Sequence, residues 1–262
     1  MTADRTRQNA DRPALVVTGG SSGIGAELCR LAARTGWRVW IGYATGEDRA
    51  RRLSAEIAER GGDADVVPLP LDDPQALRDG VAVIADHPAP VRAAALCGSP
   101  APDVGTFTKL APEQLRRQLD CAVTGNHTLA AELWRRCLRA QGGGHLLAVL
   151  SAAQGGTQGG PQAASHMAGY VAAKGGLEAL LRAAAAELGR AGLRISVVRP
   201  GYVETPMLAA FEPRLLERAR AASPGGRFLG PADVAGALMH GLLHPPEPGV
   251  VAELAADHGA SS

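Results

Sequence analysis

An excess of charge of either sign is missing from this 262-residue sequence, in which 27 basic and 26 acidic side chains leave a formal net charge of +1. So small a charge creates no field that would gather nucleic acid or an anionic membrane surface, and we expect neither as a partner. Long apolar runs are missing too, because no stretch approaches the roughly 18 residues of a membrane span, and the first residues are polar. We therefore expect a cytoplasmic location.

Cysteine is scarce and scattered, and the absence of any CxxC pair argues against a zinc site or a thioredoxin-like motif. No metal is expected. Buried, reduced thiols are the simplest interpretation of the four cysteines, Cys29, Cys97, Cys121 and Cys137.

The sequence does contain an alternation of short, β-rich apolar runs with longer helical stretches. Such an alternation is typical of βαβ units around a parallel sheet. It predicts one α/β domain over residues 13–262, with a Rossmann-type doubly wound parallel sheet of seven strands, preceded by a disordered tail at 1–12. The strands are expected at residues 14–18, 38–42, 64–69, 91–97, 145–150, 194–199 and 250–254.

Two stretches depart from this alternation. Residues 155–167 contain too much glycine for a helix, and residues 204–230 follow a strand end and are expected to form a mobile lid. Elsewhere, helices are expected at residues 23–35, 48–60, 74–85, 112–139, 168–190 and 232–244.

A glycine-rich turn joins the first expected strand to the first expected helix. In ALVVTGGSSGIGAELC, Gly19 permits a tight turn, Gly23 lets the backbone approach a pyrophosphate, and Gly25 allows the helix to pack closely on the strand. The free amides at the start of the helix then face the phosphates. An isolated turn of this kind is often only a turn, but its place in the first βαβ unit favours a dinucleotide site.

The end of the second strand decides the choice of cofactor, because an Asp or Glu there would hold the ribose 2′-hydroxyl of NAD. This sequence has GYAT at 42–45, with no carboxylate to repel a 2′-phosphate. Thr45, Ser22 or Arg49 can bind such a phosphate. NADPH is therefore favoured over NADH, although the acids at 47–48 argue weakly the other way unless they only stabilise the next helix.

Tyr170 and Lys174 stand four residues apart in a helical stretch, so both side chains project from one face. A nearby ammonium favours a phenolate, and we expect Lys174 to lower the pKa of Tyr170 from about 10 toward neutrality. The phenol would then donate a proton to a carbonyl that receives a hydride. An exposed tyrosine beside a solvated lysine is the alternative, but the only other lysine is Lys109 and the remaining 25 basic residues are arginines. A lysine in such a chain indicates a need for a compact ammonium.

Ser151 ends the strand HLLAVLS, at the edge of a parallel sheet where ligands bind. Its hydroxyl can hold the substrate oxygen, or it can simply cap a turn or a helix. His166 is the histidine placed to approach a substrate, although an exposed loop histidine is the more ordinary interpretation.

These segments together resemble the short-chain dehydrogenase/reductase family, through TGGSSGIG at 18–25, Ser151, YVAAK at 170–174 and RPGYVETPM at 199–207. The likeness covers nearly the whole chain and is greatest to 3-oxoacyl thioester reductases and polyketide ketoreductases. It implies that Tyr170 is the general acid or base, that Lys174 also holds the nicotinamide ribose, and that Ser151 positions the carbonyl.

The resemblance also implies a homo-oligomer, a dimer or a tetramer, formed through the helices at 112–139 and 168–190. It places Asp72 beside the adenine and residues 200–205 beside the nicotinamide. The full set of expected cofactor-binding residues is Gly19, Ser21, Ser22, Gly23, Ile24, Gly25, Tyr43, Thr45, Asp72, Gly98, Tyr170, Lys174, Pro200, Gly201, Val203 and Thr205.

Three features depart from the family pattern. ALCG at 95–98 replaces an Asn-Asn-Ala-Gly turn, and Ala122 stands where the family has a helical Asn that helps to hold a water of the proton relay. The 19-residue interval from Ser151 to Tyr170 is longer than usual and indicates an insertion beside the site. Strict spacing would select Thr157 in place of Ser151, but the strand end favours Ser151.

The sequence therefore predicts an NADPH-dependent ketoreductase whose substrate is an acyl-thioester or polyketide-like ketone, either a small molecule or tethered to a carrier. A dinucleotide-binding protein of the same fold with little or no turnover, such as a sensor or a partner subunit, is the alternative suggested by the two missing Asn features. A third possibility keeps the fold and changes the chemistry, for instance to a dehydration or a cyclisation.

Overall fold

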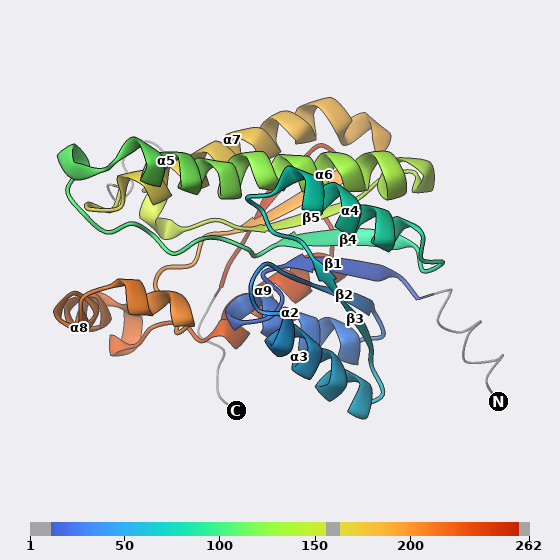
Figure 1. Cartoon of the computed structure of the whole chain (residues 1–262), viewed down its shortest axis with the longest axis horizontal. Helices are drawn as coiled ribbons and strands as arrows, with labels where there is room; N and C mark the ends of the chain where they lie inside the picture. Colours follow the sequence, from blue (N-terminus) through green and yellow to red (C-terminus); the bar gives the residue numbers. More distant parts are fainter. Residues whose placement is uncertain (1–11, 156–162, 257–262) are drawn as a thin grey trace.

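The computed structural model describes residues 12–155 and 163–256. At its centre is a parallel sheet of seven strands in the order β3-β2-β1-β4-β5-β6-β7 (Figure 1). The strands are β1 (Ala14–Thr18), β2 (Arg38–Tyr43), β3 (Asp63–Pro68), β4 (Val91–Leu96), β5 (Gly144–Val149), β6 (Leu193–Val198) and β7 (Val251–Leu254). The predicted doubly wound, Rossmann-type sheet is confirmed, and each expected strand ends within one residue of its observed limits.

Helices cover both faces of the sheet, as Figure 1 shows. One face carries α4 (Pro74–Ala85), α5 (Pro112–Leu119), α6 (Asn126–Leu133) and α7 (Ala168–Leu188), and the other carries α2 (Gly23–Arg34), α3 (Glu47–Glu59) and α9 (Pro231–Leu243). A strand covered on both faces is buried along its whole length, as all five residues of β1 are. Such strands are therefore apolar almost throughout.

A separate hydrophobic core lies on each face of the sheet. Leu133 and Leu177 belong to the first, Leu28 and Leu238 to the second, and all four side chains are buried. Each such side chain stabilises the fold by roughly 1.5–3 kcal/mol relative to an exposed one.

The expected helix at 112–139 is a continuous helical path with two wider turns. A π-helical segment, Asp120–Gly125, separates α5 from α6, and a second, Trp134–Leu138, follows α6. The backbone comes very close to its neighbour here, since a Cβ added at Gly125 would lie 2.0 Å from the carbonyl oxygen of Leu71. Wider turns of this kind are rare and are often found at functional sites.

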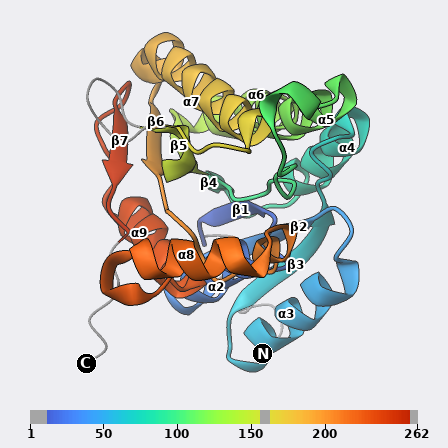
Figure 2. The same cartoon turned by 90° about the vertical axis from the view of Figure 1, so that its left-hand side faces the viewer.

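The segment expected to form a lid, 204–230, contains a helix that the sequence analysis did not predict, α8 (Pro213–Ala222). Its base is tied to the chain that follows β6, because Leu229 N donates to Tyr202 O at 3.1 Å and Glu204 N donates to Leu229 O at 2.9 Å. In Figure 2, α8 crosses one side of the molecule and the starts of α5 and α7 lie on the opposite side. The segment therefore borders the carboxyl ends of the strands.

The order of the strands reverses between β1 and β4. In doubly wound sheets, a crevice opens at this point, beyond the carboxyl ends of the strands. Within the described ranges, no helix combines the length and the apolar character needed to cross a membrane.

Candidate active site

The turn after β1 needs glycine for steric reasons. Gly19 has φ +62° and Gly23 has φ +54°, a region that side chains other than glycine rarely adopt. A Cβ at Gly19 would lie 2.9 Å from Gly98 Cα, and a Cβ at Gly25 would lie 2.4 Å from Gly19 O. The turn therefore packs closely against the end of β4 and the start of its own helix, as the sequence predicted for Gly19 and Gly25.

The first amides of α2 follow this turn directly. Ser22 is the N-cap residue and makes no capping hydrogen bond with its side chain, so the helix start keeps donors for another group. Helix starts of this kind bind phosphate through these amides and the helix dipole. The turn and the helix start thus fit the pyrophosphate of a dinucleotide.

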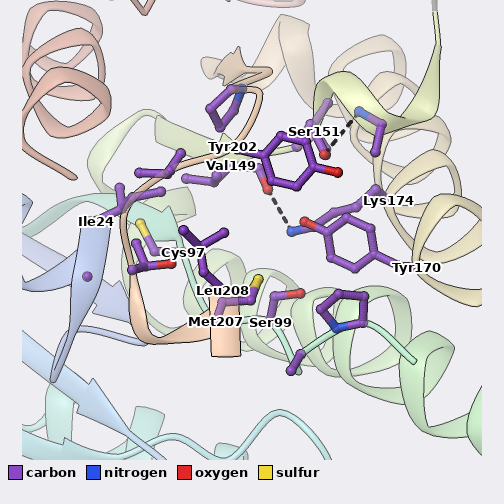
Figure 3. A pocket seen from close by; sticks show the side chains of 18 of the residues that line it. Ile24, Cys97, Ser99, Val149, Ser151, Tyr170, Lys174, Tyr202, Met207 and Leu208 are labelled. Atoms are coloured by element: carbon purple, nitrogen blue, oxygen red, sulfur yellow. Dashed lines mark hydrogen bonds between the residues drawn. The ribbon is translucent and has the colours of Figure 1, made fainter. Parts of the chain in front are cut away.

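Ser151 follows β5 and points into the same crevice. It is 8% exposed, and its Oγ accepts a hydrogen bond from Ala153 N at 3.1 Å. Tyr170 lies in the first turn of α7, and Lys174 lies one turn further on and is 2% exposed. Figure 3 shows these three side chains together, with Lys174 Nζ donating to Val149 O at 2.8 Å.

The pKa of Tyr170 is raised by burial, and a hydrogen bond with Ser151 opposes the rise. The prediction that Lys174 would lower this pKa toward neutrality is therefore wrong. Lys174 Nζ lies 5.7 Å from the centroid of the Tyr170 ring and donates to a backbone carbonyl. The loss of water around the phenol therefore outweighs the hydrogen bond with Ser151.

Burial also lowers the pKa of Lys174 to about 8, with a smaller opposing effect from Cys97. Its side chain is nevertheless protonated at neutral pH, since this pKa lies above 7. The site therefore pairs a neutral phenol with a buried ammonium.

A cavity of about 510 Å³ joins the glycine turn to these three side chains. Most of the expected site residues line it. They are Gly19, Ser22, Gly23, Ile24, Gly25, Gly98, Ser151, Tyr170, Lys174, Pro200, Gly201, Val203 and Thr205.

Four expected residues lie outside this lining. Thr45 and Asp72 are exposed, in the loops after β2 and β3, while Ser21 and Tyr43 are half-buried. Ser21 lies beside Gly46, because a Cβ at Gly46 would be 2.7 Å from Ser21 Oγ and 2.5 Å from an Nη atom of Arg49. The guanidinium of Arg49 and the hydroxyl of Ser21 therefore both lie beside Gly46, just beyond the end of β2. The last residues of β2 include no carboxylate.

Tyr202 also lines the cavity, inside the segment 200–205 that was expected beside the nicotinamide, although it was not itself among the expected cofactor-binding residues. Its ring stacks on Phe228 at 5.1 Å between centroids and meets Phe211 edge to face at 5.6 Å. Figure 3 shows it in the same part of the cavity as Ser151 and Tyr170. An aromatic residue directly after Pro-Gly at a strand end was the available signal.

Cys97 also lines the cavity and is only half-buried, unlike the other three cysteines. All four are free thiols, as expected, and the sulfur of Cys97 is buried although the residue as a whole is half-buried. Burial of its sulfur raises the pKa of Cys97 to about 12, so the thiol is neutral. It occupies one position of ALCG, the replacement for the family's Asn-Asn-Ala-Gly turn.

The two ends of the expected insertion lie next to each other beside the cavity. Ala164 N donates to Ala153 O at 2.8 Å, and Thr157 lies outside the described residues. His166 is exposed, has φ 64° and contacts Ser165 Oγ at 3.1 Å, so the ordinary interpretation of a loop histidine applies.

A family model described as enoyl-(acyl carrier protein) reductase matches residues 19–260. The chain belongs to the short-chain dehydrogenase/reductase family. A protein named as a ketoacyl reductase in Streptomyces coelicolor is 28% identical over 86% of this chain and 88% of its own length. The cis-4-hydroxycyclohexanecarboxylate dehydrogenase of Sinomonas cyclohexanicum is 33% identical over 85% of this chain and 86% of its own.

A solved structure of an actinorhodin polyketide ketoreductase variant with NADPH has a TM-score of 0.82 and 26% identity, covering 96% of this chain and 98% of that one. Together with the curated relatives, it shows that this member of the short-chain dehydrogenase/reductase family is an oxidoreductase that uses a nicotinamide dinucleotide.

The departure at Ala122 lies in the first π-helical segment of this short-chain dehydrogenase/reductase. Ala122 is buried, and its carbonyl accepts a hydrogen bond from Asn126 Nδ2 at 2.9 Å. Asn126 is 2% exposed, and its Oδ1 has no partner in the described part of the chain. The chain thus carries an asparagine one turn beyond the position at which the family pattern places one.

Proposed function

We propose that this chain is an NADPH-dependent ketoreductase acting on an acyl-thioester or polyketide-like ketone. One observation carries the proposal: Ser151, Tyr170 and Lys174 line the same cavity as the glycine turn that fits a pyrophosphate. A curated relative is named as a ketoacyl reductase, and a similar solved structure is that of an actinorhodin polyketide ketoreductase; both names support a ketone as the substrate.

The residues divide the work of reduction. When bound, the reduced nicotinamide supplies a hydride to the carbonyl carbon. Tyr170 Oη donates its proton to the carbonyl oxygen, which becomes the hydroxyl of the product. Because burial raises the pKa of Tyr170, the phenol holds this proton at neutral pH.

Ser151 and Lys174 support that proton transfer. Ser151 is hydrogen-bonded to Tyr170 and holds the same carbonyl oxygen. The Lys174 ammonium is fixed by Val149 O and stabilises the negative charge that forms on the phenol as the proton leaves. The same ammonium would hold the ribose of the cofactor.

The lining of the cavity restricts the substrate. Lys174 is the only charged side chain among the described lining residues, which include Met167, Tyr202, Met207 and Phe211. Apart from Lys174, whose ammonium is already held by Val149 O, the lining offers no charged partner to offset the water that a charged group beside the ketone would lose. We infer that the part of the substrate inside the cavity is uncharged and largely apolar, and that any charged carrier stays outside.

The preference for NADPH rests on Arg49 and Ser21 beyond β2. Arg49→Gln should raise the KM for NADPH about tenfold through the loss of a charge-assisted contact to the 2′-phosphate, and should leave the KM for NADH unchanged. Steady-state kinetics with each cofactor measure this difference. An equal change in both values would contradict the assignment.

The function itself is tested by following the loss of reduced-nicotinamide absorbance with a panel of ketones. The panel contains acetoacetyl thioesters, bicyclic ketones and, as a charged control, 2-oxo acids. We expect turnover with uncharged ketones, an alcohol as the product, and a loss of at least about 100-fold in kcat for Tyr170→Phe. Tight NADPH binding without oxidation by any ketone would favour the binding-protein alternative.

Three further predictions stay untested by the fold and the cavity. They are the cytoplasmic location, the homo-oligomer and the disordered tail at 1–12, of which residues 1–11 lie outside the described ranges.

A further inference from the structure

A pair of opposite charges lies next to the turn that carries Ser151. Arg199, which follows β6, donates to both carboxylate oxygens of Glu178 on α7, each at 2.8 Å. Each side chain is only 18% exposed. Such a two-point contact fixes the orientation of both groups as well as their separation.

Gln154 links this ion pair to the backbone of Ser151. Its Oε1 accepts from Ser151 N and from Arg199, both at 3.2 Å, and its Nε2 donates to Glu178 at 3.1 Å. The side-chain amide of Gln154 therefore joins three elements: the turn that carries Ser151 (the serine turn), helix α7 and the end of β6.

The three elements joined in this way are the ones that carry the site. Glu178 lies one helical turn after Lys174 and two turns after Tyr170. Arg199 directly precedes Pro200, whose carbonyl accepts from Ala152 N at 3.0 Å. None of Gln154, Glu178 and Arg199 is among the described residues that line the cavity, so they act on the site only through other residues.

Ser151 needs such support in this chain. It lies two residues beyond the last residue of β5, and 19 positions separate it from Tyr170 along the chain. This stretch of chain is longer than in the family pattern, and the hydrogen bonds of the network add a second, non-covalent link between the turn that carries Ser151 and helix α7.

We propose that Gln154, Glu178 and Arg199 are positioning residues that hold Ser151 against Tyr170. The role given to Ser151 rests on the proposed function. The network itself rests on hydrogen bonds that do not depend on that function.

The chain supplies a matched control on the same carboxylate. Arg182 also donates to Glu178 Oε1, at 2.8 Å, but it is 57% exposed and no hydrogen bond joins it to Gln154 in the described structure. Arg182→Met removes one cation from Glu178 and leaves the serine turn untouched. Arg199→Met and Gln154→Ala remove the link to Ser151 itself.

We expect Arg199→Met and Gln154→Ala to lower kcat about tenfold, with the dissociation constant of NADPH within about twofold of the parent value. Arg182→Met should keep kcat within about twofold. Arg199→Lys keeps the charge but loses the two-point contact, and should fall between the parent and Arg199→Met.

A second measurement needs no turnover. The chain has three tyrosines, so Tyr43→Phe with Tyr202→Phe leaves Tyr170 as the only one, and its ionisation can be followed by NMR of a 13C-labelled ring. Loss of the Ser151 contact leaves the effect of burial unopposed, and the titration of Tyr170 should move to higher pH in Arg199→Met and Gln154→Ala than in the parent and in Arg182→Met. Lys174, Cys97 and the cofactor-free cavity are the same in all variants.

The outcomes separate the two proposals. If no ketone is reduced by the parent protein, the proposed function fails, and the Tyr170 titration still decides the network. If Gln154→Ala and Arg199→Met match Arg182→Met in the Tyr170 titration, the network is purely structural and the inference is overturned. Circular dichroism identifies any variant that fails to fold. If Arg199→Met does not fold, Gln154→Ala still tests the proposal, because it keeps the ion pair between Arg199 and Glu178.

Discussion

At the scale of single residues, burial sets the chemistry of the site. Tyr170 and Lys174 share a helix face, as their spacing predicted, yet the pKa of Tyr170 rises and the pKa of Lys174 falls to about 8. Spacing shows which side chains lie close together and does not show how much water each one loses. The direction of both shifts therefore needed the structure.

Lys174→Arg tests whether a compact ammonium is required. The side chain is 2% exposed and ends on Val149 O, so the wider guanidinium has no room in the same place. We expect kcat to fall at least about 100-fold although the charge is kept. The same change at exposed Lys109 is the control, and near-parent activity of Lys174→Arg would reject the role given to Lys174.

At the scale of elements, the sequence was informative wherever local pattern decides the structure. The strand ends follow from apolar runs, and the turn after β1 follows from its glycines, two of which have positive φ. Helix α4 begins after Asp73, whose carboxylate accepts hydrogen bonds from Gln75 N and Ala76 N. The π-helical segments and the aromatic contacts of Tyr202 depend on packing between distant segments. A single sequence carries no periodic signal for them.

The aromatic wall built by Tyr202, Phe211 and Phe228 should select for substrate shape. Tyr202→Ala removes the ring that faces the cavity, and we expect the KM for a cyclic ketone to rise up to about tenfold. Tyr202→Phe keeps the ring and both ring contacts, so its KM should stay near the parent value. Steady-state kinetics with a cyclic and an acyclic ketone measure the effect.

The two variants also separate the ring from the hydroxyl. A loss in Tyr202→Phe as large as in Tyr202→Ala would mean that the phenol oxygen, and not the wall, contacts the substrate.

At the scale of the whole molecule, the chemistry lies at one end of the sheet and a buried histidine lies near the other. His145 is the second residue of β5, is 5% exposed and contacts Ser196 Oγ at 2.9 Å through Nε2. Its Nδ1 has no partner among the described residues. Burial, with a smaller effect from Arg194, lowers the pKa of His145 to about 4.

This shift makes stability depend on pH. The unfolded chain binds a proton at His145 below about pH 6.5 and the folded chain does so only below about 4, so stability is lost as the pH falls through that window. At pH 5 the loss amounts to about 2 kcal/mol. The free energy of unfolding can be measured with urea at pH 7 and at pH 5. In His145→Gln, the fall in this free energy between pH 7 and pH 5 should be smaller than in the parent protein by about that amount.

The exposed His127→Gln serves as the control for this comparison. If His145→Gln loses as much stability on acidification as the control does, the buried imidazole is not the source of the pH dependence.

The hydrogen bond from Ala164 N to Ala153 O has a consequence for how this protein can change over evolutionary time or by engineering. It brings the two ends of a long connection together near Ser151, and lengthening a loop whose ends are already joined adds little entropy cost, about 0.6 kcal/mol per doubling. Peptides of different length and composition can therefore be grafted between these two alanines while Ser151 and Tyr170 keep their places.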